Sequence, residues 1–286
     1  MADSVGKAFA TVYPSAGPNM PPLESRFVNA VLQGERALGC RILCLVQKGQ
    51  PIQPGQPFPV NLLSPWVVNA LSKSIRQMPR GEPVAVLLDS PGGDAHSAFR
   101  LARLLNRHCG GYSVIIPRYA KSAATLLSLG ATNIYFGECA ELGPLDVQVD
   151  DLDRERQMSA LEFVQSFERL SSEAMQVVDT MMNFLIVKSG KRIDALLPHI
   201  LKYSADLTRP MFEKLDTVAF TLHSRLLKIG EDYAKSLLQP KYGDDADRIA
   251  YLLTRKYPDH GYVIDQEEAA SIGLELEPIP SDIPDP

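Results

Sequence analysis

The sequence has no hydrophobic run long enough to cross a membrane, because none of its 286 residues lies in an apolar stretch of about 18 residues or more. Its amino terminus also lacks a basic region followed by a hydrophobic segment. We therefore expect neither a membrane span nor a signal peptide in this chain, and the cytoplasm is the expected location.

Basic residues are neither in excess nor clustered. Lysine and arginine together number 29, against 34 aspartates and glutamates, which gives a formal net charge of −5 and a pI near 5.6. The chain therefore lacks the positive field that favours binding to nucleic acid or to an anionic membrane surface. Neither is expected as a partner.

Cysteine is scarce, and neither its spacing nor that of the five histidines fits a metal site. A chain of this size can bury a full core and does not need disulfide bonds for stability. We expect reduced, structural thiols, no metal and no organic cofactor. The four cysteines are Cys40, Cys44, Cys109 and Cys139.

Apolar strands and amphipathic helices alternate from about residue 40 to 150. Continuous apolar runs such as 84–88 are typical of strands buried on both faces of a parallel sheet. Proline-rich stretches at 14–22 and 50–59 predict loops. The pattern predicts an α/β core. Its expected strands are 40–47, 84–88, 112–117, 133–136 and an extended piece at 144–149, and its expected helices are 64–78, 96–108 and 122–131.

The remaining sequence is mainly helical. Apolar residues at three- and four-residue steps predict two amphipathic helices over 161–185 and 211–237; residues 189–192 break the first, and residues 205–210 introduce the second. Their Met- and Leu-rich stripes indicate core or subunit interface. The chain is thus divided into a partly irregular amino-terminal segment, an α/β core, a helical arm for oligomerisation, a carboxy-terminal helix with an edge strand, and a disordered tail. These parts are 1–39, 40–150, 151–240, 241–276 and 277–286.

One hydroxyl, that of Ser122, stands where a small-residue helix begins. One βα unit earlier, Gly92 and Gly93 follow a buried strand, where glycines let the backbone turn its N–H groups toward a ligand. The two turns can lie side by side and form a serine nucleophile facing an oxyanion hole. The alternative is that Ser122 caps its helix and the glycines only make a tight turn.

Three motifs resemble one known family. "LLDSPGGDAHSAFRLARLL", "IIPRYAKSAATLLSLGATNIYFG" and "AELGPLDVQV" stand in the order and spacing of the serine dehydrogenase proteinase family. Its members are relatives of signal peptide peptidase A in the Clp protease/crotonase superfamily. The closing "YPDHGYVIDQEEAASIGLEL" is also similar to the family's last segment. The resemblance implies a Clp protease/crotonase-like ββα superhelix, followed here by an extended helical segment.

The same resemblance implies a serine endopeptidase that acts on peptide or protein substrates and assembles into a homo-oligomer. Ser122 corresponds to the family nucleophile, and the amides of Gly93 and Ala123 correspond to the oxyanion donors. Relatives use a lysine kept neutral by burial as general base, and Lys214 is the candidate in this sequence. The supporting residues are Gly92, Asp146 and His260.

The sequence departs from the family pattern at three places. Lys121 replaces methionine before the serine, Ala123-Ala124 replaces Gly-Gly after it, and Val147 replaces the proline of the Asp-Pro-Gln motif. A catalytically inactive assembly or scaffold protein on the same fold is therefore the alternative. Lys121 itself is a poor base, because neighbouring side chains on a strand or turn point apart. An acyl-CoA enzyme of this superfamily needs an adenine-nucleotide pocket, for which no residues are evident.

Overall fold

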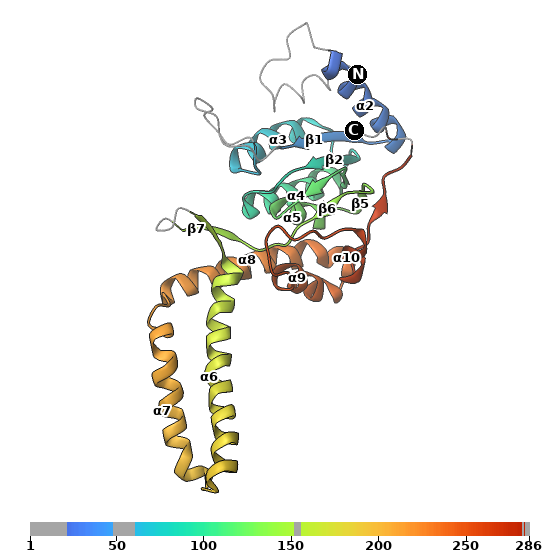
Figure 1. Ribbon diagram of the computed structural model, residues 1–286. Helices are drawn as coiled ribbons and strands as arrows, with labels where there is room; N and C mark the ends of the chain where they lie inside the picture. Colours follow the sequence, from blue (N-terminus) through green and yellow to red (C-terminus); the bar gives the residue numbers. More distant parts are fainter. Residues whose placement is uncertain (1–21, 48–60, 152–155, 282, 284–286) are drawn as a thin grey trace. The chain divides into compact units, whose positions relative to one another are not determined.

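The computed structural model describes residues 22–47, 61–151, 156–281 and 283 (Figure 1). The chain divides into two compact units. The first comprises Met1–Leu145 and Gly230–Pro286, and the second comprises Asp146–Ile229.

A parallel sheet of five strands forms the centre of the first unit. Its strand order is β1-β2-β3-β5-β9, and all neighbouring pairs run parallel. Every residue of β2 is buried, as the continuous apolar sequence predicts. The strands are β1 (Arg41–Val46), β2 (Val84–Asp89), β3 (Ser113–Ile116), β5 (Asn133–Phe136) and β9 (Glu277–Pro278).

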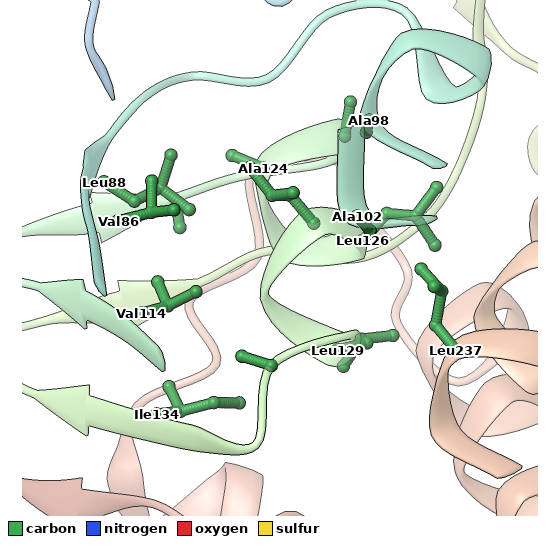
Figure 2. Close-up of a cluster of buried hydrophobic side chains, with 14 of the residues drawn as sticks. Val86, Leu88, Ala98, Ala102, Val114, Ala124, Leu126, Leu129, Ile134 and Leu237 are labelled. Carbon is green, nitrogen blue, oxygen red and sulfur yellow. The ribbon is translucent and has the colours of Figure 1, made fainter. Parts of the chain in front are cut away.

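Helices α3 (Pro65–Gln77), α4 (Ala95–Cys109) and α5 (Ala123–Leu129) follow successive strands along the chain and pack into the main core. Ser64 caps α3 by accepting a hydrogen bond from the Val67 N–H, and Asp94 caps α4 in the same way. Figure 2 shows the result: strand side chains meet small residues of α4 and α5. Those labelled include Val86, Leu88, Val114, Ile134, Ala98, Ala102 and Ala124.

The other side chains of the strands form a second apolar cluster with helix α2 (Pro22–Leu38) and the end of the chain. Ala85, Leu87 and Ile115 alternate along β2 and β3 with the residues of the main core, as period-two side chains do. Phe27 of α2 and Ile279 pack against them. Helix α2 supplies regular structure within the segment before residue 40, which the sequence predicts to be partly irregular.

The carboxy-terminal residues complete the first unit. From Gly230 onward, α8 (Thr217–Tyr242) contributes Leu237 and Leu238 to the main core, followed by α9 (Asp245–Arg255) and α10 (Gln266–Ser271). Strand β9 then pairs with β5 at the sheet edge. The edge strand therefore lies at 277–278, inside the stretch predicted to be a disordered tail. This part of the prediction is wrong, because backbone pairing with β5 orders these residues.

The second unit is a helical hairpin with a small antiparallel ribbon at its start. The ribbon pairs β7 (Gln148–Asp151) with β8 (Arg156–Ser159). Helices α6 (Ala160–Ser189) and α7 (Ile193–Phe212) then run side by side in opposite directions (Figure 1), and the Ser204 hydroxyl of α7 donates to the Ala174 carbonyl of α6. The break at 189–192 is confirmed. The prediction that 205–210 introduces the second helix is wrong, because α7 continues through these residues to Phe212.

The other predicted helices and strands of the core agree with the structure, except that the extended piece at 144–149 becomes strand only from Gln148. The predicted loop at 50–59 lies outside the described residues, as does 14–21. None of the described helices contains an apolar stretch long enough to cross a bilayer.

Candidate active site

The Gly92–Gly93 turn, which follows β2, touches the backbone around Ser122. Both glycines have positive φ, +105° and +141°, which side-chain-bearing residues rarely adopt. A Cβ atom on Gly92 would lie 2.5 Å from the Lys121 carbonyl oxygen, 2.9 Å from the Ser122 Cβ and 3.1 Å from the Ala123 nitrogen. The two turns that the sequence suggests are neighbours therefore lie against each other.

Leu63 holds the outer side of this turn. Its N–H donates to the Gly92 carbonyl at 2.7 Å, and its carbonyl accepts from the Asp94 N–H at 2.8 Å. In a trans peptide the N–H points opposite to the preceding carbonyl, so the Gly93 N–H points away from Leu63. That N–H donates to none of the described residues.

Ser122 has a strained backbone. It is the one residue other than glycine with positive φ in the described part of the chain, at φ 50° and ψ −117°. Its side chain makes no capping hydrogen bond to α5. The cap interpretation is therefore wrong. A serine forced into a sparsely populated conformation at a strand-to-helix turn, with its hydroxyl bonded to none of the described residues, has the geometry of a nucleophile elbow.

Ala123 is the first residue of α5, and a helix leaves its first N–H groups without intrahelical partners. The hydrogen bonds that form the turn do not involve the Ala123 N–H. Instead, the Ala124 N–H donates to the Lys121 carbonyl at 2.8 Å, and the Leu126 N–H donates to the Ser122 carbonyl at 3.0 Å. The Ala123 amide, next to Gly92, remains available. The substitution of glycine by alanine here leaves the donor in place.

Lys121 does not act on the serine that follows it. Its ammonium group donates to the carbonyls of Leu142 and Tyr262, at 3.1 and 3.3 Å, and forms an ion pair with Glu141 at 3.1 Å. The side chain is 15% exposed. Lys121 thus ties the strand before Ser122 to two other segments, a role that the sequence does not reveal because its partners lie far along the chain.

His260 lies in the turn between α9 and α10 and is half-buried. The segment after it is bound to the site: Tyr262 accepts from Lys121, and Ile264 pairs with Leu142 through two backbone hydrogen bonds of 2.9 and 3.1 Å. The structure therefore ties the segment that carries His260 to the strand that leads to Ser122.

Lys214 and Asp146 both belong to the second unit. Lys214 is exposed and lies in the turn between α7 and α8, so it does not begin a helix as the sequence suggested. Asp146 is 4% exposed, and its carboxylate accepts hydrogen bonds from the Leu161 N–H and the Gln148 side chain, each at 3.2 Å. Its supporting role beside Ser122 stays a prediction.

Two partly buried thiols, those of Cys40 and Cys44, are poor rivals to Ser122 as nucleophiles. Burial, reinforced by Glu35, raises the pKa of Cys40 to about 11 and that of Cys44 to about 12. A thiol reacts as its thiolate, which these pKa values disfavour at neutral pH. In the described portion of the chain, no group of three or more His, Cys, Asp or Glu side chains is placed to hold a metal ion.

Comparison with known proteins decides the family. The sequence model of the ClpP-like SDH-type serine proteinase family matches residues 68–226, more than half of the chain. The chain belongs to this family. The match includes the Gly92–Gly93 turn and Ser122, and it continues through α6 and α7. The mixed α/β architecture with its parallel sheet fits the ClpP-like fold, and membership supports a serine protease kind of function.

Two proteins of Methanocaldococcus jannaschii are similar to the chain. Uncharacterized protein MJ0137 is 27% identical over 206 residues, which are 72% of this chain and 57% of the relative. Uncharacterized protein MJ1495 is 23% identical over 244 residues, 85% of this chain and 68% of the relative. The first of these alignments thus spans little more than half of the relative's length.

Replacement of Ser122 by glycine should stabilise the fold. Relief of the strained φ and ψ is worth about 1–3 kcal/mol, and the added freedom of glycine in the unfolded chain offsets about 0.5–1 kcal/mol. We expect the free energy of unfolding in urea to rise by about 1 kcal/mol. Ser128→Gly, in the last turn of α5, should lower it instead. Equal losses in both variants would contradict the strain at Ser122.

Proposed function

We propose that the chain is a serine endopeptidase in which Ser122 attacks the peptide carbonyl. The observation that supports this most strongly is the strained Ser122, whose hydroxyl caps no helix and whose backbone touches the Gly92–Gly93 turn. Strain of about 1–3 kcal/mol persists where the surrounding structure imposes it, and it is common at active sites. Family membership supports the same chemistry.

The proposed reaction has two steps. The Ser122 oxygen forms a bond to the carbonyl carbon while the general base takes the hydroxyl proton, and the amides of Gly93 and Ala123 bind the resulting oxyanion. The intermediate collapses, the C–N bond breaks, and the leaving amine receives the proton, which leaves an ester on Ser122. Water then attacks the ester by the same route and releases the carboxylic acid. Gly92 supports this site through its close approach.

Lys214 remains our proposed general base, on the resemblance to relatives with a serine–lysine pair. A lysine acts as a base only when burial or a neighbouring charge favours its neutral form. Lys214 is exposed in the second unit, so that condition has to be supplied in the assembled or substrate-bound protein. His260 is the alternative, supported by the bonds that connect its segment to Lys121.

We propose further that the chain forms a homo-oligomer through its helical arm. Apolar side chains are exposed on α6, α7 and α8, although the matching stripes in the sequence are typical of buried surfaces. The exposed fractions are 68% for Met175, 57% for Phe184, 82% for Val187, 47% for Leu207, 52% for Met211 and 77% for Val218.

The cytoplasm is the proposed compartment. Its support is the sequence, together with the four free cysteines of the described residues, since oxidising compartments favour disulfide bonds.

A catalytically inactive scaffold on the same fold is the second candidate. The exposed position of Lys214 favours it, because an exposed lysine does not supply the base that the nucleophile needs. The scaffold and the peptidase make opposite predictions about the reactivity of Ser122.

A fluorophosphonate probe should label the wild-type chain and fail on Ser122→Ala. In this reaction the Ser122 oxygen bonds to phosphorus, fluoride leaves and the base accepts the proton. Because the hydroxyl makes no cap bond, the variant should keep its free energy of unfolding within about 0.5 kcal/mol. Ser128→Ala, which removes another hydroxyl of α5, should keep its labelling. An unlabelled wild type would favour the scaffold.

Lys214→Ala should be as inactive toward a casein substrate as Ser122→Ala, and the double variant should be no worse, because a nucleophile and its base act as one unit. Lys202→Ala, which removes another exposed lysine of the second unit, should keep full activity. Full activity in Lys214→Ala would discard this assignment. An inactive His260→Ala would then indicate a serine–histidine pair.

Light scattering at micromolar concentration should show an oligomer, with a mass at least twice the 31.5 kDa of one chain. Met175→Asp and Phe184→Asp together should reduce it toward the monomer, because each places a charge on an exposed apolar position of α6. Asp179→Asn, an exposed polar change between them, should leave the mass unaltered. A wild-type chain that is monomeric under these conditions would refute the assembly.

A further inference from the structure

Ser90 lies directly beneath the Gly92–Gly93 turn and has no exposed surface. Its Oγ accepts a hydrogen bond from the Gly92 N–H at 3.1 Å, and its hydroxyl proton is donated to the Oε1 atom of Gln47 at 2.7 Å. Gln47 follows β1 and is 3% exposed. One buried hydroxyl thus connects the turn after β2 to the end of the neighbouring strand.

The backbone of Ser90 holds the other half of the site. Its N–H donates to the Tyr119 carbonyl, and its carbonyl accepts from the Lys121 N–H, both at 3.0 Å. The Tyr119 hydroxyl in turn donates to the Gln47 carbonyl at 3.3 Å. Ser90 therefore contacts the glycine turn through its side chain and the strand leading to Ser122 through its backbone.

Two hydrogen bonds fix the peptide groups on either side of Gly92. The Ser90 hydroxyl holds the N–H of Gly92, and the Leu63 N–H holds its carbonyl. Since the Gly93 N–H lies opposite the Gly92 carbonyl in the same peptide plane, its direction depends on both bonds. Glycine restricts φ and ψ less than other residues do. The loss of one of these hydrogen bonds therefore lets the peptide plane between Gly92 and Gly93 rotate.

We propose that Ser90, oriented by Gln47, is a positioning residue that aims the Gly93 N–H at the oxyanion formed on attack by Ser122. This inference rests on the proposed function. Ser90 has no exposed surface and does not reach the substrate, so it acts only through the glycine turn.

The test is the rate of inactivation of Ser90→Ala by a fluorophosphonate probe, separated into the maximal rate kinact and the concentration for half-maximal rate. The phosphoryl oxygen of the adduct occupies the oxyanion position, so kinact reports on the amide. Loss of a complete oxyanion donor lowers a rate by about 10²–10³-fold. We expect a misdirected donor to lower kinact by roughly 10- to 100-fold, with the half-maximal concentration unchanged.

Ser128→Ala serves as the matched control, because it removes an equally buried hydroxyl that bonds only within α5. It should leave kinact unchanged. Gln47→Leu keeps the Ser90 hydroxyl but removes its acceptor, so it should lower kinact by less than Ser90→Ala. If Ser90→Ala does not fold, Gln47→Leu decides the matter by comparison with the wild type: a lowered kinact supports the inference, and an unchanged kinact overturns it.

Amide hydrogen exchange reports on the hydrogen bond between the Gly92 N–H and the Ser90 hydroxyl, and it does so independently of catalysis. The Gly92 amide should exchange faster in Ser90→Ala, while the Leu63 amide, bonded to the Gly92 carbonyl, should be less affected. A labelled wild type with an equally reactive Ser90→Ala variant would overturn this inference alone. A wild type that takes up no probe at Ser122 would overturn the proposed function.

Discussion

The contact between the Gly92 backbone and the Ser122 turn is the constraint on which the site depends. It leaves no space for a side chain, because a Cβ atom at Gly92 would lie 2.5 Å from the Lys121 carbonyl oxygen. A residue other than glycine at 92 would force the two turns apart and separate the proposed nucleophile, Ser122, from the proposed oxyanion donors.

The parallel sheet makes this contact possible. Strands β2 and β3 run parallel, and beyond their ends Ser90 pairs in parallel with Ala120, so the Gly92–Gly93 turn and the Ser122 turn become neighbours. The strain at Ser122 is then balanced by bonds from several segments. Lys121 binds the carbonyls of Leu142 and Tyr262, and the Thr125 hydroxyl accepts from the Gly143 N–H at 3.1 Å. Lysine in place of the family's methionine therefore has a structural role.

Local patterns in the sequence predict most of the core. The continuous apolar run of β2, the capped and glycine-ended α4 and the strand β5 all carry their signals within a few residues. Helix α7 was missed because Pro198 and Pro210 lie inside it, and proline is read as a helix breaker. Strand β9 was missed because an acidic, proline-rich stretch is ordered only by its distant partner β5.

The sequence predicted only part of the site, because some of its contacts join segments that lie far apart along the chain. Gly92, Gly93 and Ser122 are visible as motifs, but a serine cap and a strained serine have the same sequence, and only the backbone angles distinguish them. The roles of Lys121 and Ser90 depend on partners from other segments, such as Tyr262 and Gln47. No local pattern specifies such partners.

The most direct measurement is a crystal structure of the chain after reaction with a peptidyl phosphonate. Our account predicts a phosphorus–oxygen bond to Ser122, with the phosphoryl oxygen about 2.7–3.1 Å from the nitrogens of both Gly93 and Ala123. An adduct whose phosphoryl oxygen points to solvent, or a reagent found on any residue other than Ser122, would contradict it.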